Sequence, residues 1–207
     1  MNKPPIYLFS LSSVSGVNSI KSLDITFFDK NIDFNAYDYL IITSKQVSEY
    51  FKHFHITPPL PALAISKASA KSYEVLGGKV LEVGKGYGDT LESVVKKYPK
   101  STKWLYLRAE VIASDFTQKL REDGFLVDEE IIYKSECSQT ILNASIPKEA
   151  TLIFTSPSSI ECFLQKHTIL PSHKVIVIGK TTAKALPFGV EYLLAPTPTI
   201  KSCLEIA

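Results

Sequence analysis

The sequence predicts an α/β protein: two similar doubly wound parallel-sheet domains, one inserted in the other, joined by a two-stranded linker with the site in the cleft. Three observations lead to this prediction: apolar runs that alternate with helical patterns, a duplicated segment, and apolar runs near the N-terminus that complete the second copy. A chain of 207 residues has room for two such domains or for one large one.

Short apolar runs predict the strands, and most of them lead into a Gly, Ser or Thr cluster and then a helical pattern. The runs are continuous rather than alternating, which is typical of strands that helices cover on both faces. A strand followed by a helix, repeated along the chain, indicates a parallel sheet. The predicted strands are residues 6–9, 24–28, 39–42, 62–65, 80–83, 104–107, 130–133, 152–154, 175–178 and 192–194.

The chain also repeats itself. Residues 39–44 (YLIITS) match residues 151–156 (TLIFTS), and residues 64–71 (AISKASAK) match residues 177–184 (VIGKTTAK). The two blocks keep their order and nearly the same offset. Because two units at this spacing cannot form an array, the pattern indicates two copies of one domain.

The second copy has no strands after it, so its missing strands must come from residues 6–9 and 24–28 at the N-terminus. We therefore expect one discontinuous domain, residues 1–32 with 137–207. The inserted domain is residues 33–132, and the polar linkers lie near 29–36 and 133–146.

Composition excludes several classes of protein. Hydrophobic residues make up 45% of the chain and charged residues 21%, which suits a globular protein, and the net charge of +2 is far from that of a nucleic-acid binder. The longest apolar runs are too short to span a membrane, and the N-terminus is not typical of a signal peptide. Cys137, Cys162 and Cys203 are odd in number and widely spaced, which predicts reduced thiols in a cytoplasmic protein.

Polar turns follow four of the predicted strands, where open parallel sheets bind their ligands. Helix N-termini bind anions through free N–H groups, and hydroxyls and lysines add to that attraction. We therefore expect these turns to hold a polyanionic ligand; the alternative is that each hydroxyl only caps its helix. The candidate binding residues are Thr43, Ser44, Ser66, Lys67, Ser69, Thr155, Ser156, Ser158, Gly179, Lys180, Thr181 and Thr182.

Other candidates stand outside these turns. Arg108 ends a predicted strand, where its guanidinium either clamps a ligand carboxylate or pairs with Glu110. The turn at residues 84–88 lacks the third glycine of a dinucleotide loop, which leaves a flexible turn as the alternative to a nucleotide site. His53 and His55 have no neighbouring Cys or carboxylate in sequence, so no metal site is expected.

Several segments resemble one family. Residues 105–110 (LYLRAE), 120–124 (LREDG), 131–134 (IIYK), 152–159 (LIFTSPSS), 178–186 (IGKTTAKAL) and 195–199 (APTPT) are similar, in this order, to uroporphyrinogen-III synthases. The resemblance runs over nearly the whole chain from Tyr39 onward. The chain departs from the family pattern at Ser66 and Ala109, where the family usually has glycine.

The resemblance implies a cofactor-independent lyase of tetrapyrrole (heme) biosynthesis, cytoplasmic and monomeric. Its small-molecule substrate is hydroxymethylbilane, which loses water and closes to uroporphyrinogen III with inversion of the last pyrrole ring; no nucleic acid or membrane takes part. The family's candidate acid aligns with Tyr133, whose alternative role is aromatic packing at a strand end. Two other functions stay open: a two-lobed module that binds small anions without catalysis, and a flavin or nucleotide oxidoreductase.

Overall fold

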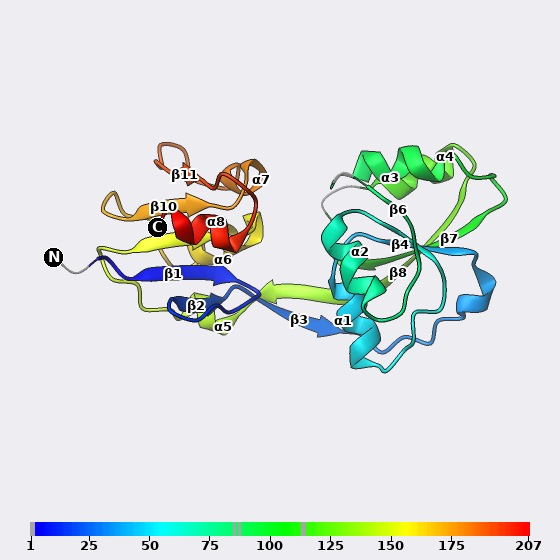
Figure 1. Cartoon of the computed structure of the whole chain (residues 1–207), viewed down its shortest axis with the longest axis horizontal. Helices are drawn as coiled ribbons and strands as arrows, with labels where there is room; N and C mark the ends of the chain where they lie inside the picture. Colours follow the sequence, from blue (N-terminus) through cyan, green and yellow to red (C-terminus); the bar gives the residue numbers. More distant parts are fainter. Residues whose placement is uncertain (1–2, 85, 87, 113–114) are drawn as a thin grey trace. The chain divides into compact units, whose positions relative to one another are not determined.

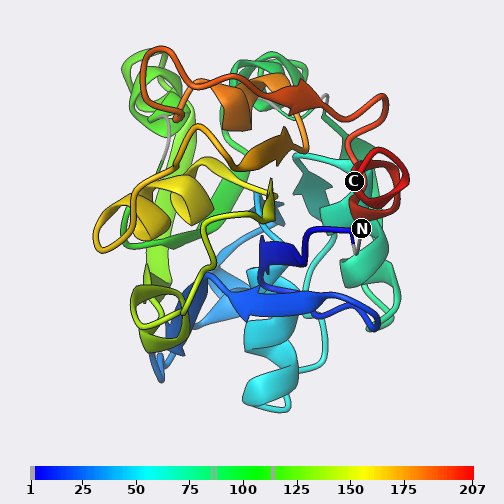
Figure 2. The ribbon, with the colours of Figure 1, turned by 90° about the vertical axis from the view of Figure 1, so that its left-hand side faces the viewer.

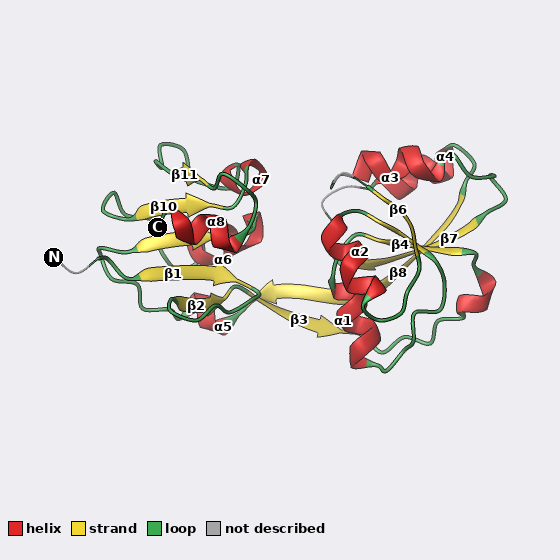
Figure 3. Cartoon of the chain, viewed as in Figure 1, coloured by secondary structure: helices red, strands yellow, loops and turns green. Residues whose placement is uncertain are grey.

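The computed structural model describes residues 3–84, 86, 88–112 and 115–207. The chain forms two compact units, of which the first is discontinuous and contains Met1–Asp24 and Glu136–Ala207. The second unit is Ile25–Ser135. Each unit has a sheet with helices on both of its faces (Figure 3), so the predicted α/β class with parallel sheets is confirmed.

The discontinuous unit is built on a five-stranded parallel sheet with the strand order β11-β10-β9-β1-β2. Its strands are β1 (Ile6–Ser10), β2 (Asn18–Lys21), β9 (Thr151–Phe154), β10 (Lys174–Val177) and β11 (Leu193–Leu194). Its helices are α5 (Gln139–Leu142), α6 (Pro157–Leu164), α7 (Lys180–Ala183) and α8 (Ile200–Glu205). Strand β1 and helix α8, from opposite ends of the chain, therefore share one unit (Figure 2).

The continuous unit is built on a six-stranded sheet with the strand order β3-β8-β7-β4-β5-β6. Its strands are β3 (Leu23–Phe27), β4 (Tyr39–Ile42), β5 (Ala62–Ala64), β6 (Val80–Val83), β7 (Lys103–Ala109) and β8 (Leu126–Cys137). Its helices are α1 (Gln46–His53), α2 (Lys67–Glu74), α3 (Gly88–Val95) and α4 (Phe116–Glu122), with a 3₁₀ turn at Phe34–Ala36. Strands β4 to β8 pair in parallel, while β3 runs opposite to β8 (Figure 1).

Both faces of each sheet are apolar. Neighbouring residues of a strand point to opposite faces, so a continuous apolar run supplies apolar side chains to both. In β4, Leu40 and Ile42 pack with helices α1 and α2, whereas Ile41 packs with helices α3 and α4. In β9, Leu152 and Phe154 pack on the side of α6, whereas Ile153 packs on the side of α8. This two-sided burial explains the continuous apolar runs of the sequence.

The two sheets share a five-strand order. Strands β8-β7-β4-β5-β6 of one unit correspond to β2-β1-β9-β10-β11 of the other. The duplicated blocks occupy equivalent strands, since β4 corresponds to β9 and β5 to β10. The N-terminal strand β1 takes the place that β7 has in the continuous unit, as the leftover apolar run at residues 6–9 implied.

The strand predicted at residues 24–28 is present as β3, but its assignment to the discontinuous domain is wrong. Strand β3 pairs with β8 of the continuous unit, and the Phe28 N–H donates to the Ile132 carbonyl at 2.9 Å. The reason is that Ile25 and Phe27 pack in the same core as Tyr50. The boundary between the units consequently falls between Asp24 and Ile25 rather than near residue 32.

The strand that completes the discontinuous unit is β2, which the sequence analysis did not predict. Its residues NSIK include one large apolar side chain, Ile20, so no apolar run marks it. A short loop leads to it from β1, and the Ser19 hydroxyl both accepts from the Val14 N–H and donates to the Val14 carbonyl. These two hydrogen bonds of one side chain hold the loop that connects β1 to β2, which is short for a connection between parallel strands.

The expectation of three reduced thiols is also wrong. Cys137, at the end of β8, and Cys162, in α6, form a disulfide with their Cα atoms 5.3 Å apart. Cys203 is free and buried. The two bonded cysteines meet because β8 returns to the discontinuous unit beside α6, a contact that their spacing in the sequence does not reveal.

Reduction of this disulfide should destabilise the discontinuous unit. The bond closes a loop with a sequence separation of 25 residues, for which the loss of chain entropy in the unfolded state is worth about 3 kcal/mol. We expect the urea midpoint to fall when the bond is reduced, and to fall equally in Cys203→Ser, which lacks only the unpaired thiol. An unchanged midpoint in protein shown to carry free thiols at Cys137 and Cys162 would contradict this expectation.

Candidate functional site

The carboxyl ends of the parallel strands bring the predicted turns of the continuous unit together. Strands β4 and β5 are neighbours, and the Ile65 N–H donates to the Ile42 carbonyl at 2.9 Å where both strands end. On the other side of β4, strand β7 places Leu107 in register with Ile42. The turns at residues 43–44 and 65–66 and the end of β7 at residues 108–110 therefore line one edge of the sheet.

Hydroxyl groups cluster where β4 ends. The Thr43 hydroxyl lies 3.0 Å from the phenol oxygen of Tyr106, which is buried in the adjacent strand β7. The next residue, Ser44, accepts a hydrogen bond from the Gln46 N–H at 3.1 Å and also interacts with the Tyr133 hydroxyl. Thr43 thus contacts the tyrosine of β7, and the Ser44 hydroxyl lowers the pKa of the tyrosine of β8.

Tyr133 itself is 7% exposed and belongs to the core that Phe27 covers, with the two ring centroids 6.3 Å apart. The aromatic packing that stood as its alternative role is therefore present. Burial raises the pKa of its phenol, and the Ser44 hydroxyl opposes that shift. The phenol consequently stays protonated at neutral pH and has a polar partner at the sheet edge.

Arg108 is held by groups of its own unit. Its Nε donates to the Glu129 carboxylate at 2.6 Å, and its Nη1 donates to the carbonyls of Ala109 and Glu110. An ion pair was the alternative to a ligand clamp, and it is present, but with Glu129 in place of Glu110, because β7 and β8 pair in a register that places Glu129 opposite Tyr106. The arginine contributes a fixed positive charge to the edge.

Glu129 collects three donors. Besides Arg108, the Arg121 guanidinium donates to it at 3.0 Å and the Thr117 hydroxyl donates to the same carboxylate. Burial alone raises the pKa of Glu129, but the hydrogen bonds from Thr117, Arg121 and Arg108 outweigh it and lower the pKa below its usual value. The carboxylate is therefore ionised at neutral pH and fixes the position of Arg108.

Helix α2 begins at the edge with a reciprocal cap. The Ser66 hydroxyl accepts from the Ser69 N–H at 3.3 Å, and the Ser69 hydroxyl accepts from the Ser66 N–H at 3.2 Å. Ser69 is 1% exposed and its hydroxyl also donates to the Ser66 carbonyl. Ser69 therefore does not present its side chain to a ligand, and its predicted binding role is corrected to a capping role. Lys67 is exposed and has no ion pair among the described residues.

The discontinuous unit has an equivalent edge. Thr155 follows β9, and its hydroxyl donates to the Phe9 carbonyl of β1 at 2.9 Å. Ser156 caps α6 through the same reciprocal arrangement, here with Ser159. Ser158 is half-buried in the first turn of α6, and its hydroxyl has no hydrogen bond within the described part of the chain.

The turn after β10 is less capped. Gly179 takes the N-cap position of α7 without a side-chain hydrogen bond, and its backbone is extended. Lys180 and Thr181 are exposed and have no side-chain partner among the described residues. Thr182 is 3% exposed and points into the unit, so the prediction that it contacts a ligand is corrected. The exposed groups of this turn are therefore a lysine and a hydroxyl.

The structure adds no support for a metal site at His53 or for a nucleotide site at residues 84–88. The imidazole of His53 packs against the rings of Phe27 and Phe54, and across the described residues no three His, Cys, Asp or Glu side chains gather in a possible metal site. Within the turn at residues 84–88, Lys85 and Tyr87 lie outside the described residues.

The continuous unit also has a cavity of about 380 Å³ at its opposite edge, where β7 and β8 begin. Its walls include Tyr37, Lys103, Trp104 and Arg121. It offers a location for a ligand that is separate from every turn considered above.

Sequence reasoning missed three members of the site: Tyr106, Thr117 and Glu129. Tyr106 was read only as part of an apolar strand, although a tyrosine near a strand's carboxyl end was a usable signal. Nothing in the sequence pairs Thr117 or Arg121 with Glu129, because that contact depends on how α4 packs beside β8.

The fold and these edges define a parallel α/β protein with hydroxyl-rich turns at the carboxyl ends of its strands. The family model of uroporphyrinogen-III synthase HemD matches residues 18–205. This chain therefore belongs to the uroporphyrinogen-III synthase family.

Solved structures of the same description have the same fold. The uroporphyrinogen-III synthetase of Helicobacter pylori 26695 aligns with a TM-score of 0.81 at 23% identity, covering 98% of this chain and 97% of that one. A mutant uroporphyrinogen III synthase of the extremely thermophilic bacterium Thermus thermophilus aligns with a TM-score of 0.55 at 14% identity, covering 90% of this chain and 86% of that one. A comparison with curated proteins gives no match. No helix within the described residues is long and apolar enough to cross a membrane.

The capping serines should affect stability in a graded way. Ser66→Ala and Ser156→Ala each remove a hydroxyl that accepts a helix N–H, so each should lower the free energy of unfolding by about 1 kcal/mol. Ser158→Ala, in the same turn as Ser156, removes an unbonded hydroxyl and should change it by less than about 0.5 kcal/mol. Urea denaturation of the three variants measures the difference, and equal losses in all three would contradict the capping roles.

Proposed function

We propose that this chain converts hydroxymethylbilane to uroporphyrinogen III, with loss of water and inversion of the last pyrrole ring. The family match over residues 18–205 is the observation that carries the proposal. The arrangement of Tyr133, Ser44 and Thr43 at one sheet edge supports it, because this edge offers a protonated phenol beside groups that bind anions.

Substrate binding rests on carboxylate recognition. The linear tetrapyrrole carries eight carboxylates, which the exposed Lys67 and Lys180 attract. The N–H groups at the starts of α2 and α6 add donors for the same anions, and the hydroxyls of Ser158 in α6 and Thr181 in α7 add further polar groups. We assign substrate binding to the turns that bear these residues, together with Thr43, Ser44, Thr155 and Gly179. Ser66 and Ser156 act there by shaping the turn rather than by offering a free hydroxyl.

Arg108 contributes in a different way. Its pairing with Glu129 leaves it less free to clamp a carboxylate, but its charge still lies at the edge. We propose that it attracts the substrate electrostatically while Glu129 holds it in place.

Catalysis consists of holding one conformation of the chain while water departs. The leaving group is the terminal hydroxyl, which departs more easily when it receives a proton. We propose that the Tyr133 phenol gives that proton and that the Ser44 hydroxyl stabilises the phenolate that results. The carbocation left on the substrate is stabilised by its pyrrole nitrogen. Ring closure follows when a carbon of the pyrrole at the other end of the chain attacks this cation, and the proton that this pyrrole then loses restores the phenol. No electrons enter or leave the reaction, so the proposal includes no cofactor.

The proposal also describes a cytoplasmic enzyme that acts as a monomer on a small molecule, without nucleic acid. The net charge of +2 supports the absence of nucleic acid, because so small a charge attracts a nucleic-acid backbone only weakly. Sedimentation of the purified protein tests the monomer, and full activity after gel filtration with a chelator tests cofactor independence. Binding of the tetrapyrrole without turnover would favour the alternative of a module that only binds anions.

Tyr133→Phe should slow formation of uroporphyrinogen III at least tenfold, since a positioned acid is worth roughly 10²- to 10⁴-fold and water recovers part of this. As enzymatic turnover falls, the spontaneous uninverted isomer should take a larger share of the product. The matched control is Tyr73→Phe, which removes another buried phenol hydroxyl of the same unit, bonded to the Leu60 carbonyl at 2.7 Å. Isomer analysis by chromatography gives the readout. A Tyr133→Phe rate within twofold of wild type would reduce Tyr133 to a packing residue.

The pH dependence should follow from the raised pKa of Tyr133. A phenol acts as an acid only while protonated, and burial moves the loss of its proton above the ordinary value of about 10. We expect no decline of kcat attributable to this group between about pH 7 and 9. A basic limb within that range that disappears in Tyr133→Phe would contradict the assignment.

Tyr106→Phe should weaken substrate binding by releasing Thr43. One hydrogen bond contributes about 1 kcal/mol, which corresponds to a rise of about fivefold in KM with little change in kcat. Thr43→Val should give a similar rise, and the double variant should add little because both changes break the same bond. Fully additive effects on KM would show that the two residues act independently.

A further inference from the structure

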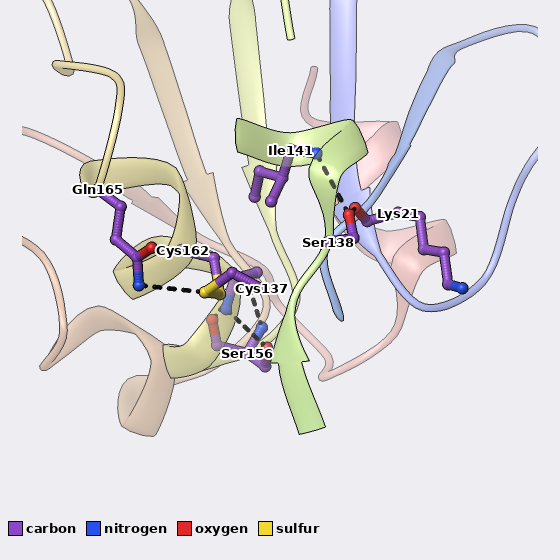
Figure 4. The surroundings of a disulfide bond; sticks show 8 residues. Lys21, Cys137, Ser138, Ile141, Ser156, Cys162 and Gln165 are labelled. Atoms are coloured by element: carbon purple, nitrogen blue, oxygen red, sulfur yellow. Dashed lines mark hydrogen bonds between the residues drawn. A yellow bond between two sulfur atoms is a disulfide. The ribbon is translucent and has the colours of Figure 1, made fainter. Parts of the chain in front are cut away.

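The disulfide lies at the point where the chain returns to the discontinuous unit. The unit resumes at Glu136, and Cys137 is the next residue and the last of β8. Its partner Cys162 lies in α6, and Figure 4 shows the bond joining the end of the strand to this helix. The bond therefore fastens the returning strand directly to the body of the unit.

A second attachment lies beside it. The Ser138 N–H donates to the Ser22 carbonyl at 3.1 Å, and the Ser138 hydroxyl donates to the Lys21 carbonyl (Figure 4). Lys21 ends β2, just before the chain leaves the unit at Asp24. The departing and returning segments are thus held together by Ser138 whatever the state of the cysteines, whereas only the sulfur atoms tie the returning segment to α6 covalently.

The two sulfur atoms differ in their surroundings. Cys162 is 2% exposed, while Cys137 is half-buried and its Sγ accepts a hydrogen bond from the Gln165 amide at 3.2 Å. Thiol attack on a disulfide goes to the accessible sulfur, which here is that of Cys137. Cys203 is fully buried and burial raises the pKa of its thiol, so it does not compete for either sulfur.

We propose that Cys137 and Cys162 form a reversible redox site that exchanges with small-molecule thiols and their disulfides. In the reducing direction, a thiolate RS⁻ attacks the Cys137 sulfur and forms a mixed disulfide, and Cys162 leaves as a thiolate that takes up a proton. A second RS⁻ attacks the sulfur of the bound R group, releases RSSR and leaves Cys137 as a thiolate that is then protonated. Two electrons pass from two thiols to the protein, and oxidation by RSSR is the reverse.

The exchange changes how firmly the returning strand is held. Helix α6 begins at Ser156, the turn to which the proposed function assigns substrate carboxylates, and its Cys162 lies less than two turns further along. The bond is the covalent tie between α6 and the end of β8. Reduction removes this tie and leaves the hydrogen bonds of Ser138, the packing of Ile141 against α6 and the contact of His167 with the Ile141 carbonyl at 2.7 Å, so local opening of both segments becomes easier.

The first experiment is a redox titration of the folded wild-type protein with reduced and oxidised glutathione, followed by acid quench, alkylation and mass spectrometry. We expect a single two-electron transition within the accessible glutathione ratios, from one alkylated cysteine to three. Cys203→Ser should show the same midpoint with one alkylation fewer at each end. A bond that stays closed, or thiols that stay free, at every ratio in the folded protein would overturn the proposal.

The second experiment compares hydrogen exchange of the oxidised and reduced forms. Amides of residues 136–142 and 158–164 should exchange at least about tenfold faster after reduction, while those of β4 and β7 in the other unit keep their rates. Cys162→Ala should match the reduced wild type at every glutathione ratio. Should that variant fail to fold, the wild-type comparison alone decides. Equal exchange in both forms would show that the bond does not control local opening of these segments, and this result does not depend on the enzyme's activity.

Discussion

The parallel pairing of β7 with its two neighbours is the constraint on which the candidate site depends. Its register with β4 places Tyr106 opposite Ile41, two residues before Thr43, so the tyrosine reaches the Thr43 hydroxyl. Its register with β8 places Glu129 opposite Tyr106 and Ile131 opposite Arg108. A shift of one residue in either pairing would turn these side chains to the other face of the sheet and dissolve the hydroxyl cluster and the arginine–glutamate pair together.

The carboxyl edges of the two sheets each illustrate how structural and functional demands share residues. Ser66, Ser69 and Ser156 use their hydroxyls to complete helix starts, so these hydroxyls are already hydrogen-bonded within the turns. Lys67, Lys180 and Thr181 have no such structural task and stay exposed. The anion binding that we propose at these turns therefore relies on the exposed side chains and on the N–H groups that the caps leave unbonded.

The strands that helices cover on both faces could be predicted from the sequence, because two-sided burial leaves a continuous apolar run, as in β4 and β9. The duplicated blocks fall on such buried strands, β4 and β5 in one unit and β9 and β10 in the other, so the duplication indicated the strand order that the two sheets share. Strand β2 could not be predicted, since its edge position demands little apolar surface, and β3 was assigned to the wrong unit because an apolar run does not say which sheet it joins. The disulfide and the contacts of Tyr106 and Glu129 depend on register and helix placement, which composition and spacing do not encode.

The central claim is that the carboxyl edges of the sheets bind the tetrapyrrole, and amide chemical shifts measure this most directly. Titration of the isotope-labelled protein with uroporphyrinogen III under reducing, anaerobic conditions should shift the amides of residues 43–45, 66–68, 155, 156 and 158 in a saturable way. Shifts confined to the opposite edge, around the cavity at Tyr37, Lys103 and Trp104, would contradict the account.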